Sequence, residues 1–371
     1  MKIGIPKEIK KQEERVALTP AAVHELVEEG STVFIQSGAG VGAGFSDDCY
    51  KKSGATLVKD AEAIYGESEM VVKVKEPQAS ECKLLREGQL LFCYLHLAAD
   101  KQLTEAVAQS GATGVAFETV TVNGRLPLLE PMSEIAGRMS ILEAAHHLSK
   151  HKGGNGTLIS GVPGVPPAKV AVLGGGTAGL NAARMAAGLG ADVTLFELNG
   201  ERIRYIDMVL PQVKTAYSNR GNLEAILPEV DILIGAVLVP GASAPKLVSR
   251  SMLKQMKRGS VLVDIAIDQG GCIETSRPTT HESPTYVEEG VVHYCVANMP
   301  GAYPRTGTCA LTNAISPFVR MLARLGLPEA CLKQPSLIDG INVLGRQVTC
   351  PGVAHAHNMK YVDPLTVIGN V

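Results

Sequence analysis

The stretch from Lys169 to Leu198, KVAVLGGGTAGLNAARMAAGLGADVTLFEL, decides the fold. An apolar run leads directly into the pattern G-x-G-x-x-G, and a helix-forming segment follows at once. A second apolar run then carries an acidic residue, Glu197, about 20 residues beyond the first glycine. Strand, glycine turn, helix, strand and acid in this order predict a Rossmann unit that binds a dinucleotide.

Each glycine of the turn has its own physical reason. Gly174 makes the tight turn, Gly176 lets a pyrophosphate approach the backbone, and Gly179 lets helix and strand pack closely. The free N–H groups of the helix N-terminus then face the phosphates. Glu197 accepts hydrogen bonds from the adenosine ribose and repels a 2′-phosphate, so NAD is favoured over NADP. An ordinary loop between strand and helix is the alternative interpretation.

Apolar runs that alternate with helical stretches continue on both sides of this unit. One helix is expected at 20–30, with Thr19 as its N-cap and Gly30 as its stop. The expected strands lie at 2–6, 32–38, 55–59, 70–75, 90–96, 113–120, 169–174, 192–198, 213–218, 231–238, 260–267 and 291–298. Such alternation predicts α/β domains whose parallel sheets are covered by helices on both faces.

Two long helical patterns, at 133–150 and 311–326, flank the glycine-turn unit. The tail after the second pattern is too short to form a domain, so the chain is expected to return to its first domain. We therefore predict two doubly wound parallel-sheet domains. A Rossmann NAD domain at 131–302 is inserted into a discontinuous Rossmann-like substrate domain at 1–130 and 303–371, and the two long helices form the hinge.

Composition excludes several classes of protein. The 371 residues carry a net charge of -2, so no basic surplus points to nucleic acid or an anionic membrane. No apolar run reaches the roughly 18–20 residues that span a bilayer, and the N-terminus is too charged for a signal peptide. The eight cysteines form no CxxC pair and are expected to be reduced core residues of a cytoplasmic protein. His355 and His357 lack a nearby third ligand, so no metal site is predicted.

Polar residues follow the strands of the first domain where parallel strands present their carboxyl ends. Arg15 lies in the loop after the first strand, while Lys75 and His96 end later strands. A guanidinium and an ammonium at one cleft suit a small carboxylate, and a histidine beside them can transfer a proton. As alternatives, Lys75 is solvent-facing and His96 is a satisfied, partly buried histidine. Lys73, on the same face of the strand as Lys75, is interpreted as structural.

The second domain offers its own candidates. Asp268 follows a strand, and Asn298 and Met299 follow the last strand, so they are expected to face the nicotinamide end of the dinucleotide. Asp264 is expected to brace the sheet or a helix N-terminus. Met132 and Met299 are expected to pack against a substrate methyl or a ring, with plain core as the competing interpretation.

Several motifs together resemble bacterial alanine dehydrogenases, in order along nearly the whole chain. They are IGIPKE, EERVALTP, VKVKEP, CYLHLAAD, PMSEIAGRMS, LGGGTAGLNAA, GAVLVPGASAPKLV, VDIAIDQGGC and VANMPGAYPRT. The resemblance implies reversible oxidative deamination of L-alanine to pyruvate and ammonia, with hydride transfer to NAD. It also implies a homo-oligomer, commonly a hexamer.

The resemblance also implies roles for individual residues. Arg15 and Lys75 hold the substrate carboxylate and carbonyl, and His96 and Asp268 take part in substrate binding and acid–base chemistry, with either as the titrating group. Met132 and Asn298 line the substrate site. The cofactor-binding residues are Ser133, Gly174, Gly176, Thr177, Ala178, Gly179, Glu197, Arg202, Ser218, Val237, Leu238, Ile265, Asp268, Val296, Asn298 and Met299. Arg202 and Arg204 would soften the preference for NAD or lie on a solvated helix face.

Two other functions compete with this one. The nucleotide-binding α subunit of proton-translocating transhydrogenase resembles the chain in GIPKE, RVALTP and VPPAKV, but exchanges hydride between nucleotides and needs no amino-acid site. A non-enzymatic NAD sensor would need no convergent cations. The presence of Lys75, His96 and Asp268 favours the dehydrogenase.

Overall fold

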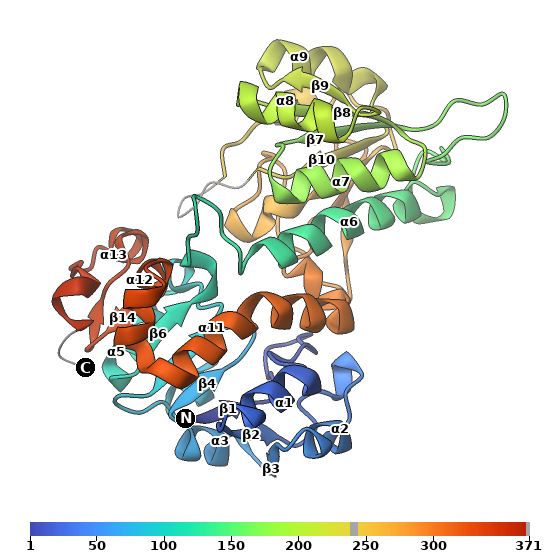
Figure 1. The fold of residues 1–371 in the computed structure, drawn as a ribbon. Helices are drawn as coiled ribbons and strands as arrows, with labels where there is room; N and C mark the ends of the chain where they lie inside the picture. The colour runs from blue at the N-terminus through green and yellow to red at the C-terminus, as the bar shows by residue number, and fades with distance from the viewer. Residues whose placement is uncertain (238–243, 369–371) are drawn as a thin grey trace. The chain divides into compact units, whose positions relative to one another are not determined.

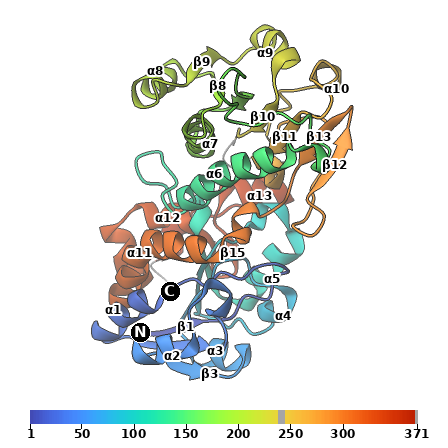
Figure 2. The ribbon, with the colours of Figure 1, turned by 90° about the vertical axis from the view of Figure 1, so that its right-hand side faces the viewer.

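The structure, a computed structural model, describes residues 1–237 and 244–368. The chain divides into two compact units. The first consists of Met1–Met132 and Tyr303–Val371, and the second of Ser133–Ala302. Each unit has its own sheet with helices packed on it (Figures 1 and 2), and the predicted α/β fold class is confirmed.

The first unit contains an eight-stranded sheet in the order β15-β14-β6-β5-β4-β1-β2-β3. Strands β1 to β6 run parallel, and β14 and β15 add an antiparallel edge. The strands are β1 (Lys2–Ile5), β2 (Thr32–Gln36), β3 (Thr56–Val58), β4 (Met70–Val72), β5 (Leu90–Cys93), β6 (Thr113–Ala116), β14 (Ile341–Leu344) and β15 (Gln347–Val348). The helices are α1 (Pro20–Glu28), α2 (Asp47–Lys52), α3 (Ala61–Glu67), α4 (Ala79–Cys82), α5 (Lys101–Ser110), α11 (Pro304–Lys333), α12 (Ser336–Gly340) and α13 (Pro351–His357), with 3₁₀ turns η1 (Val41–Ala43), η2 (Leu97–Ala99), η3 (Phe117–Thr119) and η8 (Pro364–Thr366).

The second unit contains a seven-stranded sheet in the order β12-β13-β11-β10-β7-β8-β9, antiparallel only at β12 among the strands assigned in residues 1–237 and 244–368. The strands are β7 (Lys169–Leu173), β8 (Asp192–Glu197), β9 (Lys214–Tyr217), β10 (Ile232–Gly235), β11 (Val261–Asp264), β12 (Thr285–Glu288) and β13 (Val291–Tyr294). The helices are α7 (Thr177–Gly188), α8 (Gly200–Val209), α9 (Arg220–Ile226) and α10 (Arg250–Leu253), with 3₁₀ turns η4 (Lys150–Lys152), η5 (Leu227–Glu229), η6 (Ile265–Gln269) and η7 (Met299–Ala302). Helix α6 (Glu130–His147) begins in the first unit and continues in the second.

Alternation along β7 shows why the second sheet is covered on both faces. Val170 and Val172 lie in one core cluster with side chains of α6, α7 and α8. Ala171 and Leu173 point the other way and join a second cluster with side chains of α9 and α10. Because successive strand residues face opposite sides, a fully apolar strand must have helices on both.

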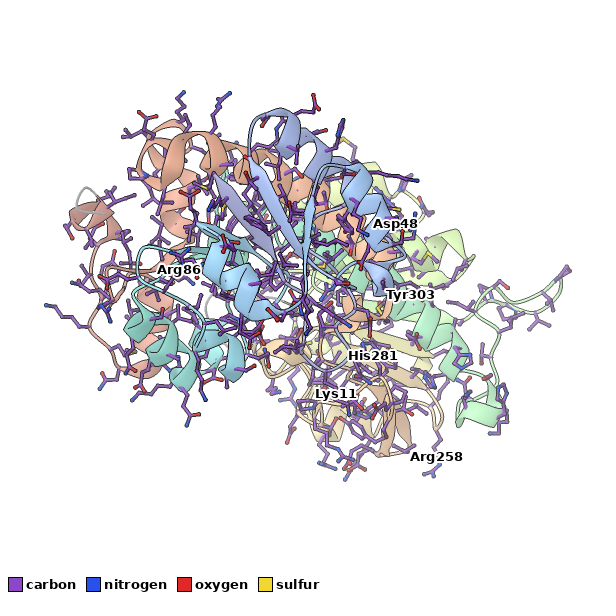
Figure 3. The ribbon with its side chains drawn as sticks, turned by 90° about the horizontal axis from the view of Figure 1, so that it is seen from below. Lys11, Asp48, Arg86, Arg258, His281 and Tyr303 are labelled. Carbon is purple, nitrogen blue, oxygen red and sulfur yellow. The ribbon has the colours of Figure 1, made fainter. Side chains whose placement is uncertain are left out.

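Side chains satisfy some of the helix ends of the first unit. Thr19 caps α1, as predicted, by accepting a hydrogen bond from Ala22 N–H at 3.4 Å. Arg86, labelled in Figure 3, donates from Nη2 to the carbonyl of Ser68 at 2.5 Å and from Nε to that of Tyr65 at 3.2 Å, at the end of α3. Orphan carbonyls of a last helical turn need such partners.

Several predicted boundaries are wrong. The strands expected at 70–75 and 90–96 end at Val72 and Cys93. In both cases a glutamate takes the backbone N–H groups that follow: Glu8 accepts from Val74 and Glu118 from His96. The two sheets are also not wholly parallel as predicted, because β12, β14 and β15 were not expected from the sequence.

Both long helices differ from their predicted bounds. Helix α6 starts three residues earlier than 133, and α11 extends over Pro304–Lys333 with a break at Gly326, where φ is 73°. A left-handed residue of this kind favours glycine. No helix in the described parts of the chain is both long and apolar enough to cross a membrane.

Candidate active site

Each sheet has a point where the chain reverses the direction in which it adds strands. In the first sheet this switch lies between β1 and β4, and in the second between β7 and β10. Ligands of open α/β sheets bind outside the carboxyl ends of the strands at such switch points. The loops after β1, β4 and β5 carry Arg15, Lys75 and His96.

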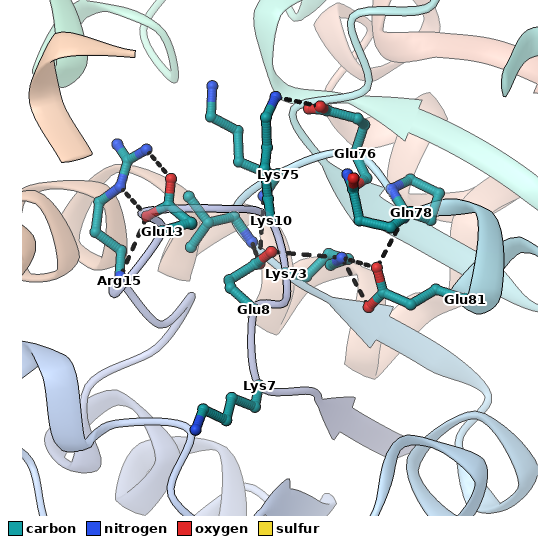
Figure 4. Close-up of polar contacts among 12 residues, drawn as sticks. Lys7, Glu8, Lys10, Glu13, Arg15, Lys73, Lys75, Glu76, Gln78 and Glu81 are labelled. Carbon is teal, nitrogen blue, oxygen red and sulfur yellow. Dashed lines mark hydrogen bonds and ion pairs between the residues drawn. The ribbon is translucent and has the colours of Figure 1, made fainter. Parts of the chain in front are cut away.

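Arg15 is buried, with 1% of its surface exposed, and is held by a neighbour in its own loop. Its Nε and Nη2 donate to the two carboxylate oxygens of Glu13 at 2.6 and 2.5 Å (Figure 4), and Nη1 lies 2.8 Å from Met132 Sδ. Burial lowers the pKa of Arg15, but hydrogen bonding to Glu13 and its charge outweigh burial, so the net shift is upward. The guanidinium therefore stays a cation in the protein interior.

Lys75 is also buried, although it lies beyond the end of β4. Its backbone N–H, like that of Val74, donates to Glu8 Oε1, at 3.3 and 2.6 Å respectively (Figure 4). Its ammonium lies 5.9 Å from the centre of the Tyr94 ring. The glutamate thus fixes the backbone from which the lysine side chain projects.

The ring of Tyr94 lies beside predicted site residues of the loops that follow the strands of the first unit. The His96 ring stacks on the Tyr94 ring with centroids 5.9 Å apart and planes at 16°. Burial raises the pKa of the Tyr94 phenol, while the charge of nearby Arg15 opposes the rise. Its hydroxyl donates to the carbonyl of Leu128 at 2.5 Å. Lys75 and His96 therefore lie beside one buried ring, and the charge of Arg15 acts on its phenol; this tyrosine was not expected from the sequence.

Glu76 gives a second sign that Lys75 and His96 share a neighbourhood. Burial raises the pKa of this carboxyl, but an ion pair with Lys10 and the charges of Lys75 and His96 give a net lowering. The charges of Lys75 and His96 contribute less to the pKa of Glu76 than burial and the ion pair with Lys10 do. A negative group thus faces the cations from their own edge of the sheet.

Lys73 has a structural environment, in agreement with its interpretation from sequence. Its ammonium is buried, 2.7 Å from Glu81 Oε2 and 3.4 Å from Glu8 Oε2 (Figure 4). Burial lowers the pKa of Lys73, and the charges of the two glutamates reverse the shift, so the group remains charged. The two lysines of VKVKEP therefore differ: Lys73 neutralises the carboxylate that holds the backbone of Lys75.

The glycine turn of the second unit follows the predicted geometry. Gly174 has φ of 96°, and a Cβ there would lie 2.8 Å from the carbonyl oxygen of Ala236 on the neighbouring β10 segment. A Cβ at Gly179 would meet the carbonyl oxygen of Gly174. At Gly176, by contrast, a Cβ would have no atom within 4 Å. Two glycines serve close packing, and the third leaves open space above the start of α7.

Glu197 and Arg202 both bind the turn itself. Glu197 Oε2 accepts from Gly175 N–H at 2.7 Å, and its Oε1 accepts from Leu198 and Asn199. The guanidinium of Arg202 donates from Nε to the carbonyl of Gly175 at 2.6 Å and lies over the Tyr205 ring. The acid therefore stands at the end of β8 beside the turn, whereas Arg204 is exposed.

These residues fit a dinucleotide. Gly176 is the N-cap of the twelve-residue helix α7 and has no side chain to cap it. The first-turn N–H groups of a helix are ready donors to phosphate, and the helix dipole favours an anion there. Ser218 follows β9, next to Glu197, whose carbonyl accepts its N–H at 3.0 Å. The turn, the helix and the two strand ends supply the donors and the acid that a dinucleotide needs.

Apart from Ser133, which lies in α6, the remaining predicted residues of the second unit lie near the ends of its strands. Asp268 is exposed in η6, where its Oδ1 accepts from the backbone N–H of Asn298 at 3.3 Å. Asp264 is buried and braces the start of η6 and Cys272, as expected. Half-buried residues of the predicted cofactor set are Ser133, Thr177, Ala178, Ser218, Val237, Ile265 and Asn298. Val296 and Met299 are buried, and Leu238 lies outside the described residues.

Sequence reasoning missed the residues that hold the cations. Tyr94, Glu8, Glu13 and Glu118 were not identified, although all four lie within motifs or strand ends that were examined. A usable signal existed only for Glu13, which stands two residues before Arg15, and for Tyr94, two before His96. Glu8 lies 66 residues from Val74, and no local pattern joins them.

The fold and these two sites define an α/β oxidoreductase with one Rossmann unit for a nicotinamide dinucleotide. Comparison with known proteins makes the class specific. Residues 4–136 match the family described as Alanine dehydrogenase/PNT, N-terminal domain, and residues 140–351 match Alanine dehydrogenase/PNT, C-terminal domain. The chain belongs to the alanine dehydrogenase family.

Individual relatives agree along the whole chain. An alanine dehydrogenase of Halomonas elongata is 53% identical over 371 residues and covers 100% of both chains. That of Geobacillus stearothermophilus is 52% identical over 370 residues, covering 98% of each. A solved L-alanine dehydrogenase superposes with a TM-score of 0.93 at 51% identity, covering 96% of this chain and 99% of its own. A transhydrogenase from Sinorhizobium meliloti reaches a TM-score of 0.82 at 25% identity, covering 94% of this chain and 100% of its own. The resemblance inferred from the motifs is confirmed.

Proposed function

We propose that this enzyme catalyses the reversible, NAD-dependent oxidative deamination of L-alanine to pyruvate and ammonia. Support comes from relatives named alanine dehydrogenase that are 50–53% identical over nearly the full chain. The observation that carries the proposal is the position of Lys75 and His96 beside the Tyr94 ring, at the same sheet edge as the buried guanidinium of Arg15. A nucleotide-binding protein without an amino-acid substrate has no use for such a set.

Each residue of the proposed site has a role that its chemistry suits. Arg15, kept charged by Glu13, pairs with the substrate carboxylate, since guanidinium and carboxylate match in geometry. Lys75 hydrogen-bonds the carbonyl oxygen of pyruvate and stabilises the negative charge that develops there during carbinolamine formation. His96, or Asp268 of the second unit, transfers the protons of water addition and ammonia release.

NAD is the dinucleotide that the second unit suits best. When bound, the nicotinamide supplies the acceptor for the hydride that leaves the substrate Cα. Glu197 stands at the end of β8 with its carboxylate on the glycine turn, where a 2′-phosphate would meet a negative charge. Gly176 leaves room for the pyrophosphate, and the start of α7 supplies N–H donors.

A steady-state assay tests the reaction. The purified protein is mixed with NAD and L-alanine, L-serine or glycine, and NADH formation is followed; pyruvate, ammonium and NADH test the reverse direction. We expect L-alanine to give the highest kcat/KM and NADP to replace NAD poorly. Hydride exchange between nucleotides with no turnover of L-alanine would instead indicate a transhydrogenase. Light scattering on the eluted protein tests the homo-oligomer, a hexamer by resemblance.

A further inference from the structure

His96 has an unusual backbone conformation for its residue type. It follows β5 with φ of 49° and ψ of 31°, in the left-handed region. An L-residue with a Cβ is strained in this conformation, because the Cβ approaches the following carbonyl oxygen. Such residues persist where neighbouring groups over-determine them, and they concentrate at functional sites. The turn at His96 should therefore have specific partners.

The first partner is Glu118, from the 3₁₀ turn η3 that follows the adjacent strand β6. Its Oε1 accepts from the backbone N–H of His96 at 2.6 Å, and both carboxylate oxygens lie 3.2 Å from the N–H of Leu95. A carboxylate that accepts two consecutive N–H groups fixes the peptide planes on the N-terminal side of His96. Charge-assisted hydrogen bonds of this kind are about twice as strong as neutral ones.

The second partner comes from the distant C-terminal segment. His357, the last residue of α13, places Nε2 2.6 Å from the carbonyl oxygen of Leu97, and Thr104 donates to the same oxygen at 2.9 Å. Because a carbonyl can only accept, Nε2 of His357 carries the proton and donates. Glu118 thus holds the peptide group that precedes His96, and His357 holds the carbonyl of the next residue, Leu97.

We propose that Glu118 and His357 are positioning residues for the imidazole of His96. They act through the backbone. Glu118 holds the N–H groups of Leu95 and His96, and His357 holds the carbonyl of Leu97. The ring is then aimed by its fixed backbone and by its stack on Tyr94. The proposal deepens the proposed function, since it rests on His96 acting on substrate, and it gives His357 a role that is not metal binding.

The second unit repeats the same arrangement at another site residue. Asn298 also has a left-handed backbone, with φ of 57°, and its N–H donates to the carboxylate of Asp268 at 3.3 Å. A carboxylate from a neighbouring strand end holds a left-handed residue in both units. The arrangement therefore belongs to the strand-end loops of the predicted site residues.

Four variants of the full-length enzyme test the proposal. Glu118→Ala and His357→Leu remove the hydrogen bonds, whereas Glu118→Gln and His357→Gln keep an acceptor oxygen and an N–H donor. We expect the first two to lower kcat about tenfold or more, because small misplacement of a reacting group is costly. The NADH dissociation constant should stay unchanged, and the two Gln variants should recover most of the loss. His355→Leu, at an exposed position of the same helix, is the matched control.

A second measurement does not depend on turnover. Hydrogen exchange of a peptide that covers residues 94–99 should speed up in Glu118→Ala and His357→Leu but not in His355→Leu. Unchanged exchange, or kcat within twofold of the parent enzyme in both disruptive variants, would overturn the positioning role. His96→Ala separates the two proposals. If this variant retains normal turnover, the proposed role of His96 in the reaction fails. Hydrogen exchange in Glu118→Ala and His357→Leu still reports whether Glu118 and His357 hold the turn.

Discussion

The two units of this enzyme have the same strand order, but the loops at their switch points carry different kinds of residue. Their central strands follow the same order, β3-β2-β1-β4-β5-β6 in the first and β9-β8-β7-β10-β11-β13 in the second. At the first switch point the loops carry charged side chains, among them Arg15 and Lys75. At the second they carry glycine and alanine, and the backbone itself lines the edge.

If the proposed function holds, the difference shows how one scaffold can bind two kinds of anion. A small carboxylate needs concentrated charge, which long side chains supply but which must be paired when buried. The first unit meets this need with Glu13 beside Arg15, and with Glu81 and Glu8 beside Lys73. A pyrophosphate is longer and can be bound by several backbone N–H groups. The second unit accordingly has glycines, which leave the backbone accessible, in place of long charged side chains. Because six strands follow the same order in both units, a few residues after each strand determine which ligand each unit can bind.

The largest effect is expected where a side chain of the first unit touches substrate. Lys75→Ala should reduce kcat/KM for L-alanine by about 10²–10³-fold, the usual effect of removing one electrostatic donor to a developing charge. NADH binding should be unchanged, because the dinucleotide residues lie in the second unit. Initial rates and NADH fluorescence titration measure both. Lys7→Ala, at an exposed lysine of the same sheet edge, is the control; near-normal turnover of Lys75→Ala would remove this residue from the proposed site.

Glycine substitutions test the backbone chemistry of the second unit. Gly179→Ala should destabilise the protein by about 1–3 kcal/mol, because its Cβ would meet the backbone oxygen of Gly174 and overpacking has this cost. Gly176→Ala should leave the free energy of unfolding within about 1 kcal/mol, yet weaken NADH binding, since its methyl group enters the space left for phosphate.

Denaturant unfolding and NADH titration of the two glycine variants measure this contrast. If Gly176→Ala bound NADH as tightly as the parent protein, the phosphates would lie elsewhere than above α7.

The sequence predicted the second unit better than the first, and the reason is the range of the contacts. The glycine turn, α7 and Glu197 lie within one continuous stretch, and each glycine acts on neighbours close in sequence or on the next strand. Local patterns are sufficient for such a site. Its strands β7 and β8 accordingly end within one residue of the expected positions.

In the first unit the decisive contacts join distant residues. The predicted strands through Lys75 and His96 end early because Glu8 and Glu118 take their N–H groups from 66 and 22 residues away. No strand was expected in the tail, yet β14 pairs with β6 across more than two hundred residues. Hydrophobic periodicity carries no information about such pairings. Residue types at the strand ends were therefore predictable, whereas the residues that hold them were not.

The pH dependence of stability is expected to distinguish the two units less strongly than the substitutions above. The second unit buries His293 as a neutral ring, whose Nδ1 donates to the carbonyl of Val291 while Nε2 accepts from Thr275. Burial lowers the pKa of His293 below its usual value. As pH falls below about 6.5, the unfolded chain gains a proton that the folded chain does not, so stability falls with decreasing pH by up to about 1.4 kcal/mol per pH unit.

Chemical denaturation between pH 7 and pH 5 measures this slope. His293→Gln should have a smaller slope than the parent protein, whatever its stability at pH 7. An identical slope in His293→Gln and the parent protein would show that this histidine does not titrate differently on folding.

The smallest effect concerns Arg202, a cation that binds the glycine turn at the second switch point. Arg202 donates to the carbonyl of Gly175, so it acts on the backbone of the turn, unlike the cations of the first unit. Arg202→Met should weaken NADH binding roughly threefold, the equivalent of one modest hydrogen bond. The ratio of kcat/KM for NAD and NADP should change little, and Arg204→Met should have no effect because Arg204 is exposed. A selective loss of NADP use in Arg202→Met would instead assign this guanidinium to the ribose phosphate, and the second switch point would then also bind by side-chain charge.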